Sequence, residues 1–242
     1  MLNNNLTRWW EEVSNEFERV MDEPALSLAM AHFAARLDFK FFAFVFRQSL
    51  PGTGLQSHLL SNYPNHWIEH YKRSSYSKVD PILRQGARTC GLVVWSDNLF
   101  SRASSFWKEA KQAGLSVGVS QSAWSRNGTY TVLSLARSSV PLDSQTAAEL
   151  EPYVLLLSNI VTLRAQDILG GSLPRVQRTS LTEREIEILR WSANGKTAFE
   201  VADILGISES TINFHLHNTR RKLGVSTKLE AAAYAARQGL LD

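Results

Sequence analysis

Cysteine is almost absent from this chain of 242 residues, in which Cys90 is the only one. A single cysteine can form neither an intrachain disulfide nor a CxxC metal or redox site. Long apolar runs are absent as well: none exceeds the length of Phe41–Phe46, whereas a membrane-spanning helix needs about 20 such residues. The N-terminal residues also lack the apolar core of a signal peptide. These absences predict a cytoplasmic protein with no membrane partner.

The chain has little net charge: 26 Lys and Arg against 23 Asp and Glu give a positive excess of only +3. Such an excess does not argue for nucleic acid by itself, so the placement of the charges must decide. Apolar residues make up 44% of the chain, as in ordinary globular proteins. Six of the seven tryptophans precede residue 125, which fits either a small-molecule pocket or an ordinary core.

The segment from Gly170 to Ser180 divides the chain into a long part and a short part. It holds two glycines, a proline and polar residues without periodicity, which is typical of a linker. We therefore expect a first domain over residues 1–169, a linker over 170–180 and a second domain over 181–242.

The first domain mixes helical and strand patterns. Helical spacing of apolar residues is found over 9–21, 26–37, 64–74, 100–114 and 144–168, and strand patterns over 39–47, 92–95, 116–124 and 130–136. Asn127-Gly128 is a strong hairpin signal between the last two strands. The order of elements predicts an α+β fold, in which helices cover an antiparallel sheet as an α/β/α sandwich.

The second domain is expected to be all helical, with helices at 182–193, 197–205, 209–223 and 227–238. Thr182, Thr197 and Thr227 are each followed three residues later by glutamate, which is the capping-box pattern. Ser208 is the expected N-cap of the third helix. The turn 205–208 contains a glycine and joins the second and third helices, as in a helix-turn-helix.

The third of these helices has an apolar face and a polar face. Ile212, Leu216, Thr219 and Leu223 are expected to pack on the second helix through Val201, Ile204 and Leu205. The polar face and the basic end carry groups suited to base edges and phosphates, although a solvated polar surface is the alternative. The DNA-binding candidates are Lys196, Thr197, Ser210, Thr211, Asn213, Phe214, His217, Arg220, Arg221 and Lys222.

These residues also carry a family resemblance. Leu181–Leu189, Gly195–Thr197 and Ile207–His215 resemble the four-helix DNA-binding domain of the LuxR family, over residues 178–242. The resemblance implies that the third helix enters the major groove and that Glu185, Leu189 and Gly195 occupy near-constant positions. It also implies that the fourth helix pairs two such domains, through Leu229, Ala232, Ala233 and Ala236.

Such DNA-binding domains follow either a phosphoacceptor receiver or a domain that binds a small signal. A receiver needs an early acidic pair at the end of an apolar strand. The pairs present, Glu11-Glu12 and Asp22-Glu23, lie in or beside amphipathic helices, which argues against a receiver.

A second set of motifs fits the signal-binding class. Tyr63-Pro64-x-x-Trp67-x-x-x-Tyr71, followed by Asp80-Pro81, Trp95 and Gly118, resembles the acyl-homoserine-lactone domain of quorum-sensing LuxR-type regulators, over residues 5–168. Trp9-Trp10, Val94–Asp97 and Leu133–Arg137 look closest to the rhamnolipid-regulating branch and its phenazine-regulating relatives. The resemblance implies an N-acyl-homoserine lactone as the ligand, with no other cofactor and no metal.

The residue types agree with that ligand. The Trp67 indole can only donate, which suits the lactone carbonyl, and the Asp80 carboxylate can only accept, which suits the amide N–H. Tyr71 and Ser134 hydroxyls can donate to the amide oxygen, and Trp95 supplies an aromatic wall. Taken alone, Trp67 and Tyr71 are more typical of a helix core, Asp80 before Pro81 of a turn or cap, and Trp95 indicates nothing, so the prediction rests on the set. The acyl chain is expected among Tyr63, Ala43, Val45, Leu59, Val79 and Leu115.

One departure from the family concerns the strand that begins near Gly118. Many relatives have a proline after it, where this chain has Gln121-Ser122-Ala123-Trp124. Because Trp124 is large, the end of the pocket is expected to differ, which leaves the preferred acyl chain length open.

No catalytic constellation is found. The glutamate between His66 and His70 is misplaced for a zinc protease motif, no G-x-S-x-G elbow occurs, and Cys90 has no activating partner and is expected to be a small buried residue.

The predicted protein is therefore not an enzyme but a quorum-sensing transcriptional regulator. It binds an N-acyl-homoserine lactone and, as a homodimer, a two-fold symmetric promoter site, with RNA polymerase as a further partner. The alternative is a LuxR-type regulator that responds to another small molecule or to a stabilising protein partner. The operator, and the choice between activation and repression, stay open.

Overall fold

The structure, a computed structural model, describes residues 4–50, 54–85, 91–124, 129–138, 140–169, 181–237 and 239–241. The chain forms two compact units, one made mainly of residues up to 171 and the other mainly of residues from 172 onward. We call them the N-terminal and C-terminal units. The expected linker, the Asn127-Gly128 turn and Cys90 lie outside the described residues.

A five-stranded sheet lies at the centre of the N-terminal unit. Its strands are β1 (Phe41–Leu50), β2 (Gly54–Ser61), β3 (Val93–Val94), β4 (Val117–Trp124) and β5 (Tyr130–Arg137), in the order β2-β1-β5-β4-β3. β4 pairs antiparallel with both β3 and β5.

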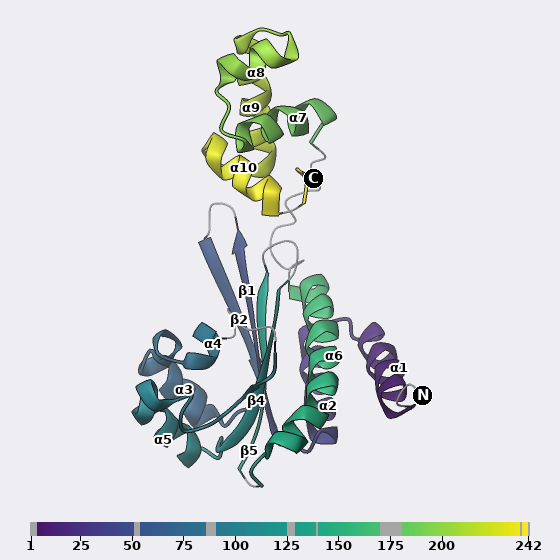
Figure 1. The fold of residues 1–242 in the computed structure, drawn as a ribbon, viewed down its shortest axis with the longest axis vertical. Helices are drawn as coiled ribbons and strands as arrows, with labels where there is room; N and C mark the ends of the chain where they lie inside the picture. The colour runs from purple at the N-terminus through teal and green to yellow at the C-terminus, as the bar shows by residue number, and fades with distance from the viewer. Residues whose placement is uncertain are drawn as a thin grey trace. The chain divides into compact units, whose positions relative to one another are not determined.

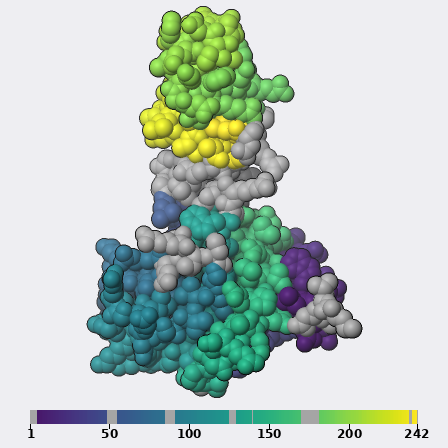
Figure 2. Space-filling model, in the orientation of Figure 1, coloured from purple at the N-terminus to yellow at the C-terminus, as the bar shows by residue number. Residues whose placement is uncertain are grey.

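Helices cover both faces of this sheet (Figure 1). On one face lie α1 (Asn4–Glu18), α2 (Glu23–Arg36) and the long α6 (Ser144–Leu169). On the other lie α3 (Asn65–Arg73), α4 (Pro81–Gln85) and α5 (Ser104–Gln112), with short 3-10 turns at Tyr76–Lys78 and Ser101–Ala103. Figure 2 shows α3 and α5 in blue to teal and α6 and α1 in green and purple. The predicted sandwich is confirmed.

Strand alternation gives the sheet two separate cores. Phe42, Phe44 and Phe46 of β1 pack against α1, α2 and α6 in the first core, because every second side chain of a strand points to the same face. Phe41 and Val45 of the same strand face the opposite layer. There the second core gathers Trp67, Ile82, Phe100, Phe106, Trp107, Ala110, Leu115, Tyr130, Val132 and Ala136.

Most elements of this unit lie where the sequence patterns predict them, but the short helix α4 and the strand β2 were not expected. In β2, Gln56, Ser57 and His58 are polar, and Gly54 lowers strand propensity. β2 is an edge strand beside β1, and of its side chains Leu60 is buried in the first core. Its strand conformation is therefore set by the neighbouring strand, which no local pattern reports.

Four helices form the C-terminal unit: α7 (Glu183–Ala193), α8 (Ala198–Leu205), α9 (Glu209–Leu223) and α10 (Lys228–Arg237). Thr182 with Glu185 and Thr197 with Glu200 form the predicted reciprocal capping boxes. Ser208 accepts from Thr211 N at 3.1 Å and starts α9. Gly206 adopts a left-handed φ of 65°, which allows the tight turn between α8 and α9.

Two residues of this unit do not pack as predicted. On α8, Val201 and Leu205 pack in the core as expected, but Ile204 is 44% exposed and Ala202 is buried beside Val201 instead. On α10, Ala232 is buried in the core of its own unit and therefore cannot contact a partner. The exposed side of α10 carries Leu229, Ala233 and Ala236.

Among the described helices, none combines the length and the apolar character needed to cross a lipid bilayer.

Candidate functional site

Helix α3 brings two of the predicted signal-binding residues onto one face. Trp67 and Tyr71 are one turn apart, and their ring centroids lie 6.2 Å from each other. Trp67 is buried and also contacts Phe106 of α5, with a centroid distance of 5.8 Å. Both aromatic residues therefore face the second core rather than solvent.

Asp80 meets Tyr71 at the edge of that core. The Tyr71 hydroxyl donates to Asp80 Oδ2 at 2.9 Å, and the backbone N–H of Ile82 donates to Oδ1 at 2.8 Å. Asp80 is only 8% exposed. An ionised carboxylate can only accept hydrogen bonds, so any further group that pairs with Asp80 must be a donor.

Tyr63 lies next to this charge. Burial, and then the negative charge of Asp80, raise the pKa of Tyr63 far above its ordinary value. The phenol therefore stays protonated at any physiological pH and can serve as a hydrogen-bond donor.

Trp95 connects the segment after β3 to the sheet. Its indole N–H donates to Ser120 Oγ at 2.9 Å, and Ser120 Oγ lies 2.8 Å from Ser134 Oγ on the neighbouring strand. Ser120 was missed in the sequence. The available signal was its position two residues after Gly118, because alternate residues of a strand share a face.

The close approach of the Trp95 ring explains why residue 118 is a glycine. A Cβ at this position would lie 2.6 Å from Trp95 Cε3 and 2.8 Å from the carbonyl oxygen of Leu135. Only glycine allows the Trp95 ring to approach the strand so closely.

The residues expected around the acyl chain divide into two groups. Tyr63, Val45 and Leu115 pack in the second core, and Ala43 lies on the same face of β1 as Val45. Leu59 and Val79 are 43% and 47% exposed, so the structure does not bring them into that core.

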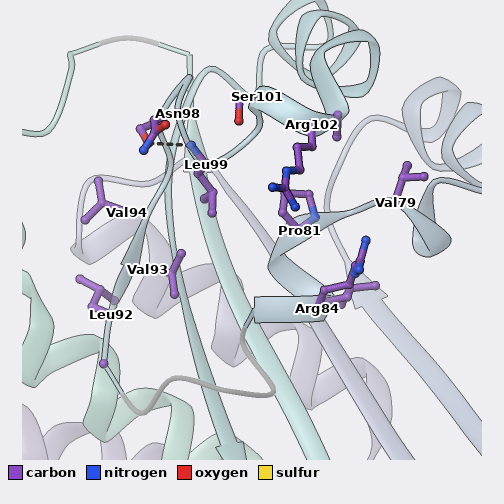
Figure 3. Close-up of a pocket in the computed structure, with 14 residues that line it drawn as sticks. Val79, Pro81, Arg84, Leu92, Val93, Val94, Asn98, Leu99, Ser101 and Arg102 are labelled. Atoms are coloured by element: carbon purple, nitrogen blue, oxygen red, sulfur yellow. Dashed lines mark hydrogen bonds between the residues drawn. The ribbon is translucent and has the colours of Figure 1, made fainter.

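Val79 instead lines an open cleft on the outside of this layer. Figure 3 shows Val93 and Val94 of β3 on one side of the cleft and Val79, Pro81 and Arg84 on the other. None of the described residues that line it is Trp67, Tyr71, Asp80 or Ser134. The cleft nevertheless borders the second core, because Leu83, Val93, Leu99 and Ala103 line it and also pack against that core.

Hydrogen bonds to Glu109 connect α5 to α3 and to the 3-10 turn that follows it, beside the second core. His70 Nε2 lies 2.5 Å from Glu109 Oε2, and the Tyr76 hydroxyl donates to the same oxygen at 2.6 Å. Hydrogen bonds from Tyr76 and then His70 lower the pKa of Glu109, and the bond to Glu109 raises the pKa of Tyr76. His70 thus has a structural partner, and within the described part of the chain no cluster suits a metal ion.

Helix α9 separates its faces as predicted. Ile212, Leu216, Thr219 and Leu223 are buried against the rest of the C-terminal unit. The DNA-binding candidates of α9 that are exposed are Ser210, Asn213, Phe214, His217 and Arg221.

Several other candidates already have partners within their own unit. Lys222 Nζ donates to Glu185 Oε2 at 2.7 Å, and Arg220 donates to the carbonyls of Leu216 and Ser226. Burial of Glu185 opposes ionisation, but the hydrogen bonds from Lys222 and Thr182 outweigh it and lower its pKa. Lys222 therefore joins α9 to α7.

The remaining DNA-binding candidates form hydrogen bonds at the starts of α8 and α9. Thr197 caps α8, Lys196 pairs with Glu200 at 3.2 Å, and the Thr211 hydroxyl lies 2.8 Å from Ser208 Oγ. These groups hold the helix starts in place, while the exposed face of α9 is left to solvent.

Two protein families match the chain in succession. Residues 22–165 match the family described as "Autoinducer binding domain". Residues 179–235 match "Bacterial regulatory proteins, luxR family".

Relatives match over nearly the whole length. The HTH-type quorum-sensing regulator RhlR of Pseudomonas aeruginosa is 34% identical over 233 residues, which is 96% of each chain. The transcriptional activator protein SolR of Ralstonia solanacearum is 33% identical over 96% of this chain and 98% of its own.

Solved structures share the fold. The crystal structure of Escherichia coli SdiA gives a TM-score of 0.83 at 30% identity and covers 98% of this chain and 99% of that chain. SdiA in complex with octanoyl-rac-glycerol gives 0.84 at 30% identity and covers 100% and 98%. The chain therefore belongs to the LuxR family of quorum-sensing transcriptional regulators, which are not enzymes, and combines an autoinducer-binding domain for a small-molecule ligand with a helix-turn-helix domain that binds DNA.

Proposed function

We propose that the small-molecule ligand is an N-acyl-homoserine lactone and that it binds in the second core of the N-terminal unit. The observation that carries this proposal is the convergence of Trp67, Tyr71 and Asp80 in one buried aromatic layer, to which Trp95 also belongs. A ligand that fills such a layer must satisfy its polar groups, since each buried group left unpaired costs about 1–3 kcal/mol.

The polar groups of the lactone can be assigned one by one. The Trp67 N–H donates to the lactone carbonyl, Asp80 accepts the amide N–H, and Ser134 donates to the amide oxygen. Tyr71 takes a different part from the one expected, because its single hydroxyl hydrogen is donated to Asp80. It therefore orients the carboxylate, and Tyr63 and Trp95 line the pocket with Ala43, Val45 and Leu115.

The C-terminal unit then acts as one half of a DNA-binding dimer. α9 enters the major groove, where Ser210, Asn213, Phe214 and His217 face base edges and Arg221 faces the phosphates. Thr197, the N-cap of α8, and Lys196 and Thr211, which lie beside the starts of α8 and α9, contribute to phosphate binding. A two-fold symmetric operator follows from a homodimer.

The homodimer forms in part through α10. Leu229 is 79% exposed, and Ala233 and Ala236 follow it at helical spacing on the same side. Small side chains allow two helices to approach closely. The same proposal includes a ligand-binding domain over 1–169 and a DNA-binding domain over 181–242. It also includes a cytoplasmic location, since the protein must reach the chromosome, and contact with RNA polymerase.

A second candidate ligand is another acyl amphiphile, which is favoured by the SdiA structure with octanoyl-rac-glycerol. The test is extraction of the protein after expression with a mixture of acyl lactones and acylglycerols, followed by mass spectrometry. Recovery of a lactone supports the proposal, and recovery of an acylglycerol alone supports the second candidate. If neither a lactone nor an acylglycerol is extracted, and lactone leaves the thermal stability of the protein unchanged, both candidate ligands are contradicted. A stabilising protein partner would then be favoured.

A further inference from the structure

Ser120 links two of the residues assigned to the ligand pocket. Trp95 Nε1 donates to Ser120 Oγ at 2.9 Å, and Ser120 Oγ lies 2.8 Å from Ser134 Oγ. The register of β4 and β5 places the two serines directly opposite each other. They are 2% and 8% exposed. We call this hydrogen-bonded series, Trp95 to Ser120 to Ser134, the relay.

The direction of the relay follows from the chemistry of its first member. An indole N–H can donate but has no acceptor atom, so Ser120 Oγ must accept from Trp95. The relay has three hydrogens on its polar atoms and only two internal bonds. Among the described residues, no other side-chain hydrogen bond to either serine is found, so one hydroxyl hydrogen is left for an outside acceptor.

Which serine carries that unused hydrogen depends on which of the two donates the hydrogen bond between them. If Ser134 donated to Ser120, the unused hydrogen would lie on Ser120, the less exposed of the two, where an unpaired donor is costly. If Ser120 donates to Ser134, the unused hydrogen lies on Ser134. Bonds that run in one direction also polarise one another and so strengthen the last donor.

We propose that Ser120 is a positioning residue that makes the Ser134 hydroxyl a hydrogen-bond donor toward the ligand. The ligand atom that meets Ser134 is therefore an acceptor, such as the oxygen of an acyl amide, and a ligand that offers only an N–H at this point is disfavoured. The inference rests on the proposed function, because it assigns Ser134 to the ligand.

A double-mutant cycle tests the coupling between the two serines. N-octanoyl-L-homoserine lactone is titrated calorimetrically into the full-length protein and into S120A, S134A and the double variant. S120A should weaken binding roughly tenfold when Ser134 is present and less than about twofold in the S134A background. S120T keeps the hydroxyl and should bind nearly as the unchanged protein does. Equal losses from S120A in both backgrounds would mean that Ser120 acts by packing alone, and would overturn the proposal.

A second readout needs no ligand. The indole N–H proton of Trp95 is followed by NMR in the unliganded protein, and S120A should shift it upfield because its acceptor is lost, while S120T should restore it. An unshifted resonance in S120A would overturn the relay whatever the titrations give. If the unchanged protein does not bind the lactone, the proposed function fails, and the relay is then judged on this resonance alone.

Discussion

Asp80 is the residue at which the fold and the proposed ligand compete for the same atoms. Its carboxylate oxygens accept hydrogen bonds from the Tyr71 hydroxyl and from Ile82 N. An ionised carboxylate can only accept, which selects a ligand with an N–H at this point.

Replacement of Asp80 by asparagine changes this acceptor into a mixed donor and acceptor. Asp80→Asn keeps the bond from Ile82 N but presents an NH₂ group either to Tyr71 or to the ligand. We expect a loss of lactone affinity of about tenfold to a hundredfold, as for hydrogen bonds to charged groups, with the fold retained. Calorimetric titration measures the affinity and circular dichroism the fold. Asp167→Asn on the exposed side of α6 is the matched control, and equal affinities for the two variants would contradict the role of Asp80.

Gly118 gives a second prediction at the scale of one residue. In Gly118→Ala the new methyl group would collide with the Trp95 ring and with the carbonyl oxygen of Leu135. Neither group can move away without disturbing the packing around it. We expect the free energy of unfolding to fall by about 1–3 kcal/mol, as in other overpacked cores. Near-ultraviolet circular dichroism during urea unfolding reports it through the tryptophans.

Gly91→Ala serves as its control, because its Cβ would meet only Glu151 Oε1 at 3.5 Å, an ordinary contact. We expect a change within roughly 0.5 kcal/mol for this variant. If Gly118→Ala were as mild, the close approach of Trp95 would not explain the glycine.

Among whole elements, those with local signals were predictable from sequence. The capping boxes at Thr182 and Thr197 depend on residues three apart and are present as expected. The face of α10 was not predictable, because Ala232 and Ala233 are equally small and only tertiary packing buries the first. For the same reason β2 was missed: its polar residues become a strand only beside β1.

Strand register shows the same limit within the site. A two-residue loop at Asn127-Gly128 would set Trp124 opposite Thr131, whereas Trp124 pairs with Tyr130. A shift of one residue exchanges the two faces of a strand. The pairing of Ser120 with Ser134, on which the relay depends, was therefore beyond what the hairpin signal could supply.

The joint between α7 and α9 predicts a pH dependence. The pKa of Glu185 in the folded protein lies below its ordinary value of 4.5, so the pair with Lys222 stabilises the fold above that value and is lost as pH falls through the lowered pKa. Glu185→Gln should lower the free energy of unfolding by about 1–3 kcal/mol at neutral pH and flatten its decline at acid pH. The NMR signal of Trp191, the only tryptophan after residue 124, reports this unit during urea unfolding.

Glu187→Gln is the control for that experiment, because Glu187 forms an exposed pair with Arg184 on the same helix. Exposed pairs contribute little, so its pH profile should follow that of the unchanged protein. If the free energy of unfolding varied with pH identically in both glutamine variants, the pair of Glu185 with Lys222 would not stabilise the packing of α7 against α9.

The exposed face of α9 predicts two separable effects on DNA binding. Asn213→Ala should remove discrimination at one base pair, at a cost of about 1–3 kcal/mol, because a base-edge contact carries sequence information. Arg221→Ala should weaken binding to all sequences and reduce the salt slope by about one, because a phosphate contact releases one counterion. Fluorescence anisotropy at several salt concentrations measures both.

Arg19→Ala, which removes the same charge from an exposed position just after α1, is the control and should change neither quantity. The division of roles along α9 would be wrong if Asn213→Ala left the base preference intact or if Arg221→Ala altered the preference but not the salt slope.

Across the whole molecule, the groups proposed for the ligand and for DNA belong to different cores. The polar groups assigned to the lactone lie at the second core of the N-terminal unit, whereas α9 packs in the separate core of the C-terminal unit. A ligand that binds only the folded form stabilises it by about 2.7 kcal/mol at a hundredfold excess over its dissociation constant. That free energy becomes a transcriptional signal only if the stabilised form is the one that assembles on DNA.

Assembly on a two-fold operator makes the binding of the second half-site intramolecular, so that dimer affinity far exceeds that of one unit. The exposed residues Leu229, Ala233 and Ala236 of α10 provide the contact that we propose. Ala233→Glu places a charge in the middle of this surface without touching the buried Ala232. We expect sedimentation velocity to show a shift toward monomer and the affinity for a two-half-site operator to fall at least tenfold, while binding to one half-site is retained. Ala35→Glu, an equally exposed change near the end of α2, should leave both unchanged, and a fully dimeric Ala233→Glu variant with undiminished operator affinity would remove α10 from the interface.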